Sequence, residues 1–135
     1  MARLAKTNTG KLADLANMVQ ARSTGDRVRS LNDDFRKSLL GGKVFLTSGV
    51  QALSSGDQSA LIIALRTYDD FDDADDPHGE HDWGTLDLMG RDGSPRLRTF
   101  WKIDYYDLRL EGPSPDPANP EVTLRVLTLM LDSEY

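Results

Sequence analysis

The chain has 135 residues, a formal net charge of −6, 39% hydrophobic residues and no cysteine. A chain of this length can build one hydrophobic core without covalent cross-links, and the lack of cysteine excludes disulfides and thiolate zinc sites. No apolar run approaches the ~20 residues of a membrane span, and the start MARLAKTNTGKLADL lacks the apolar centre of a secretory signal, so we expect a cytoplasmic protein that does not bind membranes.

The charges are unevenly distributed along the chain. Residues 1–40 contain eight Lys/Arg and four Asp/Glu, which gives +4, residues 41–90 contain two and ten, which gives −8, and residues 91–135 contain six and eight, which gives −2. Because Lys and Arg drive most nucleic-acid affinity, the acidic middle third argues against direct nucleic-acid binding. It favours a protein partner with a basic surface.

Two helices are predicted near the start. GKLADLANMVQARS has apolar residues at helical spacing until STG at 23–25 interrupts the pattern, so we interpret 1–23 as an N-terminal helical extension and 24–135 as a single domain. The second helix is predicted in TGDRVRSLNDDFRKSLLGG, where Gly41-Gly42 provides a left-handed stop. Its apolar face is formed by Val28, Leu31, Phe35 and Leu39.

A short strand in KVFLTSG and a third, more apolar helix in SSGDQSALIIALRTYDDF follow. WGTLDLMGRDGSPRLRTFWKIDYYDLRL then predicts a β-hairpin, with strands near 83–90 and 97–108 and a turn at 92–95. In the second strand, alternation places Phe100, Lys102, Asp104 and Tyr106 on one face. Counting back from the turn pairs residue 83 with residue 104, within about two positions of register.

The chain closes with EVTLRVLTLMLDSEY, which we interpret as a strand over about 121–133, although a helix after Pro120 also fits the leucine spacing. Helices and strands come in separate runs. We therefore expect an α+β fold with two or three helices packed on a mainly antiparallel sheet of about four strands.

The stretch FDDADDPHGEHDWG, residues 71–84, contains both histidines of the chain and a dense group of carboxylates. Carboxylates this close together raise a negative potential that attracts basic partners, although such runs are often only solvated loops. The predicted partner-binding residues are Asp69, Asp70, Asp72, Asp73, Asp75, Asp76 and Glu80.

Two chemical alternatives use the same segment. A divalent metal would take its ligands from His78, Glu80, His81 and Asp82, but their spacing matches neither a zincin nor an EF-hand, so we expect no cofactor. If the protein is instead a catalyst, the hairpin register would bring its candidate acid–base residues together at the open end. These residues are His81, Asp82, Asp104 and Tyr106. A third reading makes His81 a structural anchor of the loop.

The motifs LNDDFR at 31–36, GEHD at 79–82, KIDYYD at 102–107 and the closing segment SPDPANPEVTLRVLTLMLDSEY resemble a family of small bacterial proteins of unknown function, family 3768. This chain has His78 where the family pattern usually has Tyr, which makes His81 the family-level histidine. The resemblance implies no known activity, but it implies an association with mobile elements and hence an accessory or anti-defence role.

We therefore predict a small acidic interaction protein rather than an enzyme. Its expected partner is a protein with a basic surface that acts on nucleic acid, and its expected role is that of an anti-CRISPR or anti-restriction type of inhibitor. The alternative is a small hydrolase or a ligand- or metal-binding domain that uses the His81, Asp82 and Asp104 cluster.

Overall fold

The structure, a computed structural model, describes residues 24–135, and the extension predicted for residues 1–23 lies outside the described residues. Residues 24–38 are helical, and the named elements that follow are β1 (Gly42–Leu46), α2 (Ser48–Gln51), α3 (Ser55–Arg66), β2 (Trp83–Met89), β3 (Pro95–Tyr106), β4 (Leu124–Leu131) and the 3-10 turn η1 (Asp132–Glu134). In this part of the chain no helix has the length and apolar character that a membrane span requires.

The four strands form one sheet in the order β1-β4-β3-β2. β4 pairs antiparallel with β3, β3 pairs antiparallel with β2, and β1 pairs parallel with β4. The predicted α+β class is confirmed. The strand interpretation of the last segment is confirmed as well, and the helical alternative after Pro120 is wrong, because residues 124–131 form β4 and pair with both β3 and β1.

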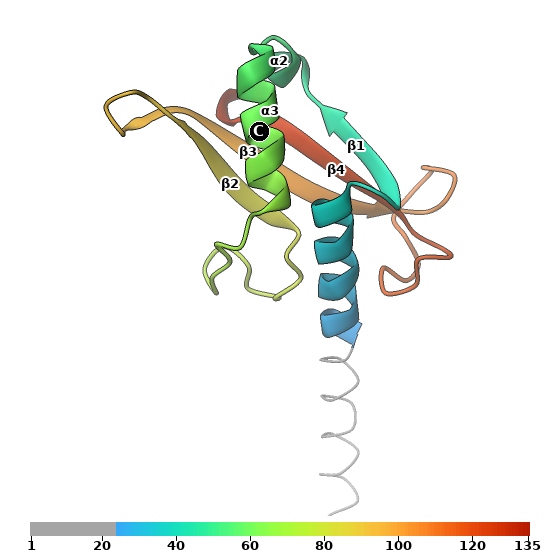
Figure 1. The fold of residues 1–135 in the computed structure, drawn as a ribbon. Helices are drawn as coiled ribbons and strands as arrows, with labels where there is room; N and C mark the ends of the chain where they lie inside the picture. Colours follow the sequence, from blue (N-terminus) through green and yellow to red (C-terminus); the bar gives the residue numbers. More distant parts are fainter. Residues whose placement is uncertain (1–23) are drawn as a thin grey trace, which may run out of the picture.

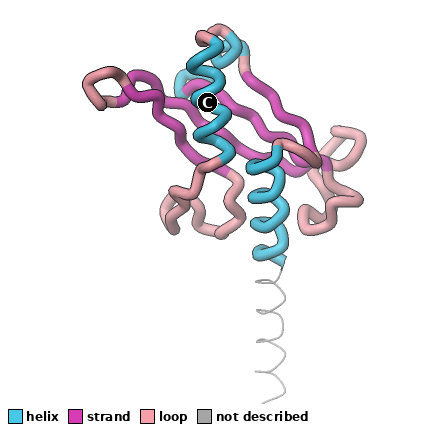
Figure 2. The backbone as a smooth tube through the Cα atoms, viewed as in Figure 1, coloured by secondary structure: helices cyan, strands magenta, loops and turns pink. Residues whose placement is uncertain are grey.

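The helices all pack on one face of the sheet (Figures 1 and 2), and the core lies between the two layers. Trp101 of β3 and Leu129 of β4 are fully buried at its centre, directly paired across the two middle strands. The whole core cluster consists of Phe35, Val50, Leu61, Leu65, Leu86, Leu88, Trp101, Ile103, Leu127 and Leu129.

Local sequence explains most element boundaries. The Ser54 side chain accepts a hydrogen bond from the backbone N–H of Asp57 (3.1 Å) and so caps the start of α3. The 24–38 helix ends earlier than its glycines indicate, because Leu39 itself adopts a left-handed conformation (φ 59°) and donates its N–H to the carbonyl of Phe35 (2.7 Å). The short α2, which buries Val50, was not predicted.

The hairpin register places Trp83 opposite Lys102, within the error of the predicted pairing with residue 104. Gly84, next to Trp83, is required by packing. A side-chain carbon at this position would lie 2.5 Å from Trp101 Nε1 and 2.6 Å from Tyr68 Cζ. The start of β2 therefore lies directly against the core, and it fixes where the preceding acidic loop ends.

Candidate functional site

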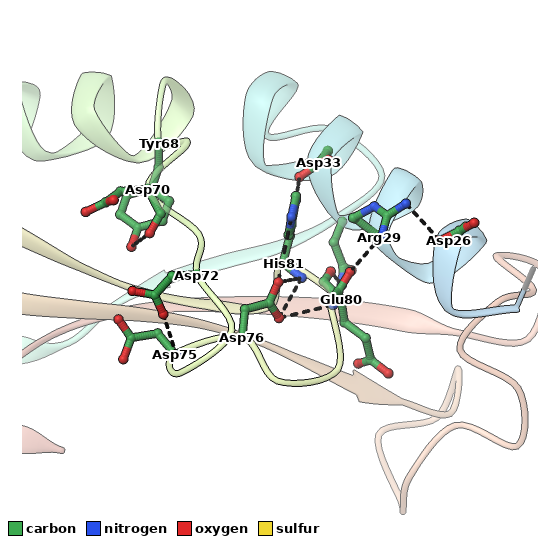
Figure 3. A network of polar contacts seen from close by, with 12 residues as sticks. Asp26, Arg29, Asp33, Tyr68, Asp70, Asp72, Asp75, Asp76, Glu80 and His81 are labelled. Carbon is green, nitrogen blue, oxygen red and sulfur yellow. Dashed lines mark hydrogen bonds and ion pairs between the residues drawn. The ribbon is translucent and has the colours of Figure 1, made fainter. Parts of the chain in front are cut away.

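The acidic segment forms the loop between α3 and β2, next to the 24–38 helix (Figure 3). Phe71, the aromatic residue among its aspartates, packs edge-on against Tyr68 (ring centroids 4.8 Å apart) and Trp101 (6.1 Å). This contact attaches the middle of a highly charged loop to the hydrophobic core. The carboxylates on either side of Phe71 are therefore held in place rather than carried on a free segment.

Asp76 fixes the second half of the loop. It is only 8% exposed, and its carboxylate accepts hydrogen bonds from the backbone N–H groups of Glu80 (3.1 Å) and His81 (3.2 Å). Its own N–H donates to the carbonyl of Asp72 (2.8 Å). A buried carboxylate that accepts backbone N–H groups closes a turn. Asp76, predicted as part of the exposed partner-binding surface, is instead part of the loop's internal structure.

His81 connects the loop to the 24–38 helix. Its ring lies flat on Phe71, with centroids 3.7 Å apart and planes 3° from parallel. Its Nδ1 lies 2.9 Å from an Asp33 carboxylate oxygen, and its Nε2 lies 3.7 Å from Asp76. The backbone of His81 is left-handed (φ 56°), an uncommon state for a non-glycine residue. This conformation turns the side chain toward the helices.

Asp33 links this histidine to Arg36. Burial works to raise the pKa of Asp33, but hydrogen bonds from Arg36 and His81, together with their charges, outweigh it and hold the pKa below the ordinary 3.8. The Arg36 guanidinium is itself buried, lies over the Phe71 ring (5.1 Å), and donates to the backbone carbonyl of Tyr68 (3.1 Å). Arg36 thus holds the start of the loop as His81 holds its end.

A buried polar chain runs beneath the Glu80 end of the loop. Arg125 Nε donates to the Asn32 side-chain carbonyl (2.8 Å), and Asn32 Nδ2 donates to the Tyr105 hydroxyl (2.7 Å) and to the Glu80 backbone carbonyl (2.9 Å). The Tyr105 hydroxyl donates in turn to the Glu80 carboxylate (3.0 Å). Glu80, predicted for partner binding, is therefore partly buried and occupied within the protein.

Asp82 lies beside this buried polar chain. Its pKa is raised above 3.8, first by burial and then by the charge of Glu80. Burial and the charges of Glu80 and Asp82 also raise the pKa of Tyr105. Glu80, Asp82 and Tyr105 thus form a compact group in which the phenol stays protonated and one carboxyl holds its proton more tightly than usual.

The remaining, outer aspartates of the loop differ from these inner carboxylates in their exposure and in their charge partners. They are exposed, and among residues 24–135 no ion pair involves any of them. The nearby Arg29 donates to Asp26 (2.8 Å) and to the carbonyl of Gly79 (3.3 Å) rather than to an outer aspartate. Figure 3 shows Asp70, Asp72 and Asp75 on the side of the loop away from His81. We call this group, Asp69, Asp70, Asp72, Asp73 and Asp75, the acidic surface.

The structure does not bring the four predicted acid–base residues together. Asp104 and Tyr106 point to the sheet face opposite the helices, where Asp104 pairs with Lys102 (2.8 Å), whereas His81 and Asp82 lie on the helix side. His78 is exposed. Within the described residues, no group of three or more His, Asp and Glu side chains is arranged to hold a metal ion.

Sequence reasoning missed the polar residues that build this site. Asn32, Arg36 and Arg125 are each at most 4% exposed, yet polar residues are normally assigned to the surface. A signal was present, because Asn32 and Arg36 follow Val28 at intervals of four residues and therefore continue the buried face of the helix. This spacing could have marked them as inward-facing.

Comparison with known proteins identifies a family but no activity. The family described as "Protein of unknown function (DUF3768)" matches the chain over residues 46–134, which include the acidic loop and all of β2, β3 and β4. No curated protein and no solved structure matches the chain. The chain belongs to this family, as its motifs predicted, and the match begins after the 24–38 helix.

Proposed function

For this member of the family, we propose that the acidic surface is a docking site for a basic surface on another protein. The observation that supports the proposal is that the two arginines nearest the loop, Arg29 and Arg36, do not pair with the aspartates of the acidic surface. Arg29 and Arg36 are close to the loop but hold its backbone and the helix carboxylates, so the acidic surface is left without ion pairs in residues 24–135.

A fixed array of charge binds better than the same charges on a free segment. The loop is held by Phe71 on the core, by Asp76 within the turn and by His81 on the helix, so little ordering remains to be done when a partner binds. Negative potential also speeds encounter with a positively charged surface. The partner is thus selected by basic charge.

The partner class that fits best is a protein that acts on nucleic acid, since such proteins present basic grooves for phosphates. A row of aspartates can occupy a groove of this kind in place of a nucleic-acid backbone. We therefore extend the proposal to an inhibitor of the anti-CRISPR or anti-restriction type.

The test is affinity capture from a bacterial lysate with three baits. The first is the wild-type chain. The second replaces four exposed aspartates, Asp69, Asp70, Asp73 and Asp75, by Asn. The third carries the same change in net charge at four exposed carboxylates elsewhere, namely Asp34, Glu111, Glu121 and Asp132 changed to amides. Asp72 is kept because its carboxylate accepts the N–H of Asp75 (2.7 Å) and shapes the turn.

We expect the wild-type and third baits to retain a nucleic-acid-binding protein that salt and added DNA both release, and the second bait to lose it. Four exposed ion pairs at about 0.5 kcal/mol each give about 2 kcal/mol, roughly a thirtyfold loss of affinity. Equal capture by the second and third baits would mean that net charge, and not this surface, attracts the protein. The proposal would then be abandoned.

A second candidate function is favoured by the group formed by Glu80, Asp82 and Tyr105, in which the pKa of Asp82 is raised by burial and by Glu80. A carboxyl of this kind can act as a proton donor or take part in binding a ligand or a metal. Elemental analysis and thermal melts in EDTA, Mn²⁺ and Zn²⁺ separate this reading from the first. One metal per chain, or a large rise in melting temperature with either ion, would favour it.

Two substitutions, His81→Ala and Asp82→Asn, separate the candidates further. If His81 anchors the loop, its removal lowers thermal stability and changes partner binding only as far as the loop loosens. If the second candidate is correct, Asp82→Asn abolishes function in a protein that remains folded.

A further inference from the structure

The sheet has a second face, which points away from the helices. We call it the outer face, and its central side chains are Phe45, Trp83, Thr85, Phe100, Lys102, Asp104, Tyr106, Val126, Thr128 and Met130. In Figures 1 and 2, α2, α3 and the 24–38 helix all lie on the other side. Phe45 remains 51% exposed and Met89 54% exposed, so large apolar side chains face solvent here.

The aromatic residues on this face are ordered by their contacts with one another. Phe100 stacks on Trp83 (centroids 5.4 Å apart) and also contacts Tyr135 (5.3 Å). Beside them a shallow hollow of about 440 Å³ is lined by Lys102, Asp104, Tyr106, Thr128, Met130 and Tyr135, among others. The outer face therefore combines an apolar and aromatic platform with one central charged pair.

The charges on this face are balanced, unlike those of the rest of the chain. Lys102 pairs with Asp104 (2.8 Å), and Arg98 pairs with Asp87 (3.0 Å). With Lys43, the strand side chains of the outer face carry three positive and two negative charges, and Glu134, which lines the hollow, brings the sum to 0, against −6 for the whole chain. A basic partner gains little here, and a nucleic acid would need unpaired cations.

A second copy of the chain fits this face for two reasons. Two chains that each carry −6 repel one another least through the face that has no negative excess, with their acidic loops on the helix sides. In addition, Lys102 and Asp104 are two positions apart on one strand and point the same way. A two-fold rotation places each beside the opposite charge of the other copy, and such self-complementarity is what a symmetric dimer requires.

We propose that two copies pack their outer faces together, with Lys102 of each chain beside Asp104 of the other. The arrangement is a sandwich of two sheets about 10 Å apart, in which the helices of each chain lie on the side of its sheet away from the other chain. Phe45, Trp83 and Phe100 are then covered, and both acidic surfaces remain free. The dimer is independent of the acidic-surface proposal, because neither depends on the residues of the other.

Sedimentation velocity over a range of protein concentrations tests the proposal with a charge exchange. Lys102→Asp leaves two acidic residues at the centre of the face, and Asp104→Lys leaves two basic ones, so each variant alone should dissociate at least tenfold more readily than wild type. An equimolar mixture should restore a dimer, because the two-fold arrangement pairs opposite charges at both contacts.

Matched controls keep the result specific. Lys37→Asp and Asp73→Lys change the net charge equally but lie away from the outer face, and both should dimerise as wild type does. Circular dichroism and thermal melts check that every variant is folded. Three results would overturn the proposal: a wild-type chain that stays monomeric, single reversals that leave dimerisation unchanged, or a mixture that forms no heterodimer.

Discussion

Replacing Asn32 by Leu removes the centre of the buried polar chain while keeping the number and branching of the side-chain heavy atoms. The Asn32 side chain is fully buried and makes three hydrogen bonds, to Tyr105, to the Glu80 carbonyl and from Arg125. Leucine can make none of them. The change therefore isolates the cost of buried polar groups that lose their partners.

The magnitude follows from what is left behind. The Glu80 carbonyl loses a donor, and the buried Arg125 Nε–H loses its acceptor, whereas Tyr105 still donates to Glu80. An unsatisfied buried group costs about 1–3 kcal/mol, and more when it is charged. We therefore expect a loss of about 4 kcal/mol in the free energy of unfolding, a large fraction of the roughly 5–15 kcal/mol typical of a domain.

Urea denaturation followed by tryptophan fluorescence measures this loss, since Trp101 is buried in the core. Adding Arg125→Met to Asn32→Leu removes the group that lost its acceptor, so the double variant should cost less than the sum of the two single changes. A loss below about 1 kcal/mol for Asn32→Leu, at an unchanged denaturant slope, would show that the network contributes little and that this reasoning is wrong.

Three further predictions concern the same region. Gly84→Ala should destabilise the protein by about 2 kcal/mol in urea melts, because the new carbon meets Trp101 and Tyr68, whereas Gly56→Ala, with its nearest neighbour 4.0 Å away, should not. The pKa of Asp82 is raised by burial and by Glu80, so its ionisation destabilises the fold as pH rises through that pKa. Asp82→Asn should be more stable than wild type at neutral pH and equal to it in acid below 3.8; no gain at neutral pH would contradict the assignment. Asp33 has the opposite sign, because despite the effect of burial its pKa is held low by Arg36 and His81. Asp33→Asn should lose stability at neutral pH and show a smaller further loss as pH falls below 3.8, which thermal melts across the acid range would detect.

Periodicity was enough to predict the main elements. The alternation in β3 placed Phe100 and Asp104 on one face and Trp101 on the other, as observed. The 24–38 helix and α3 followed from apolar residues three and four positions apart. These patterns predict the elements well because each arises from burial of a whole face, which involves many residues at once.

The site was harder to predict because it depends on single exceptions. Asp76 is one aspartate in a run, and only its position opposite the N–H groups of Glu80 and His81 distinguishes it from its exposed neighbours. Likewise, a left-handed backbone is expected at glycine and not at histidine, so the residue type at position 81 did not indicate that His81 turns toward Asp33. The expected grouping of His81 with Asp104 assumed that the strand continues regularly back to residue 81.

The order of the strands has a consequence for how the molecule is made. β4 is the last strand along the chain, yet it lies between β1 and β3 and pairs with both. Until residue 131 has left the ribosome, β1 has no hydrogen-bonding neighbour, and β3 exposes the edge that later pairs with β4. Contacts between such distant parts of the chain form slowly, and unpaired edges are prone to aggregate. The sheet therefore cannot be completed before β4 has been synthesised, so this eight-residue strand joins β1 to the rest of the sheet.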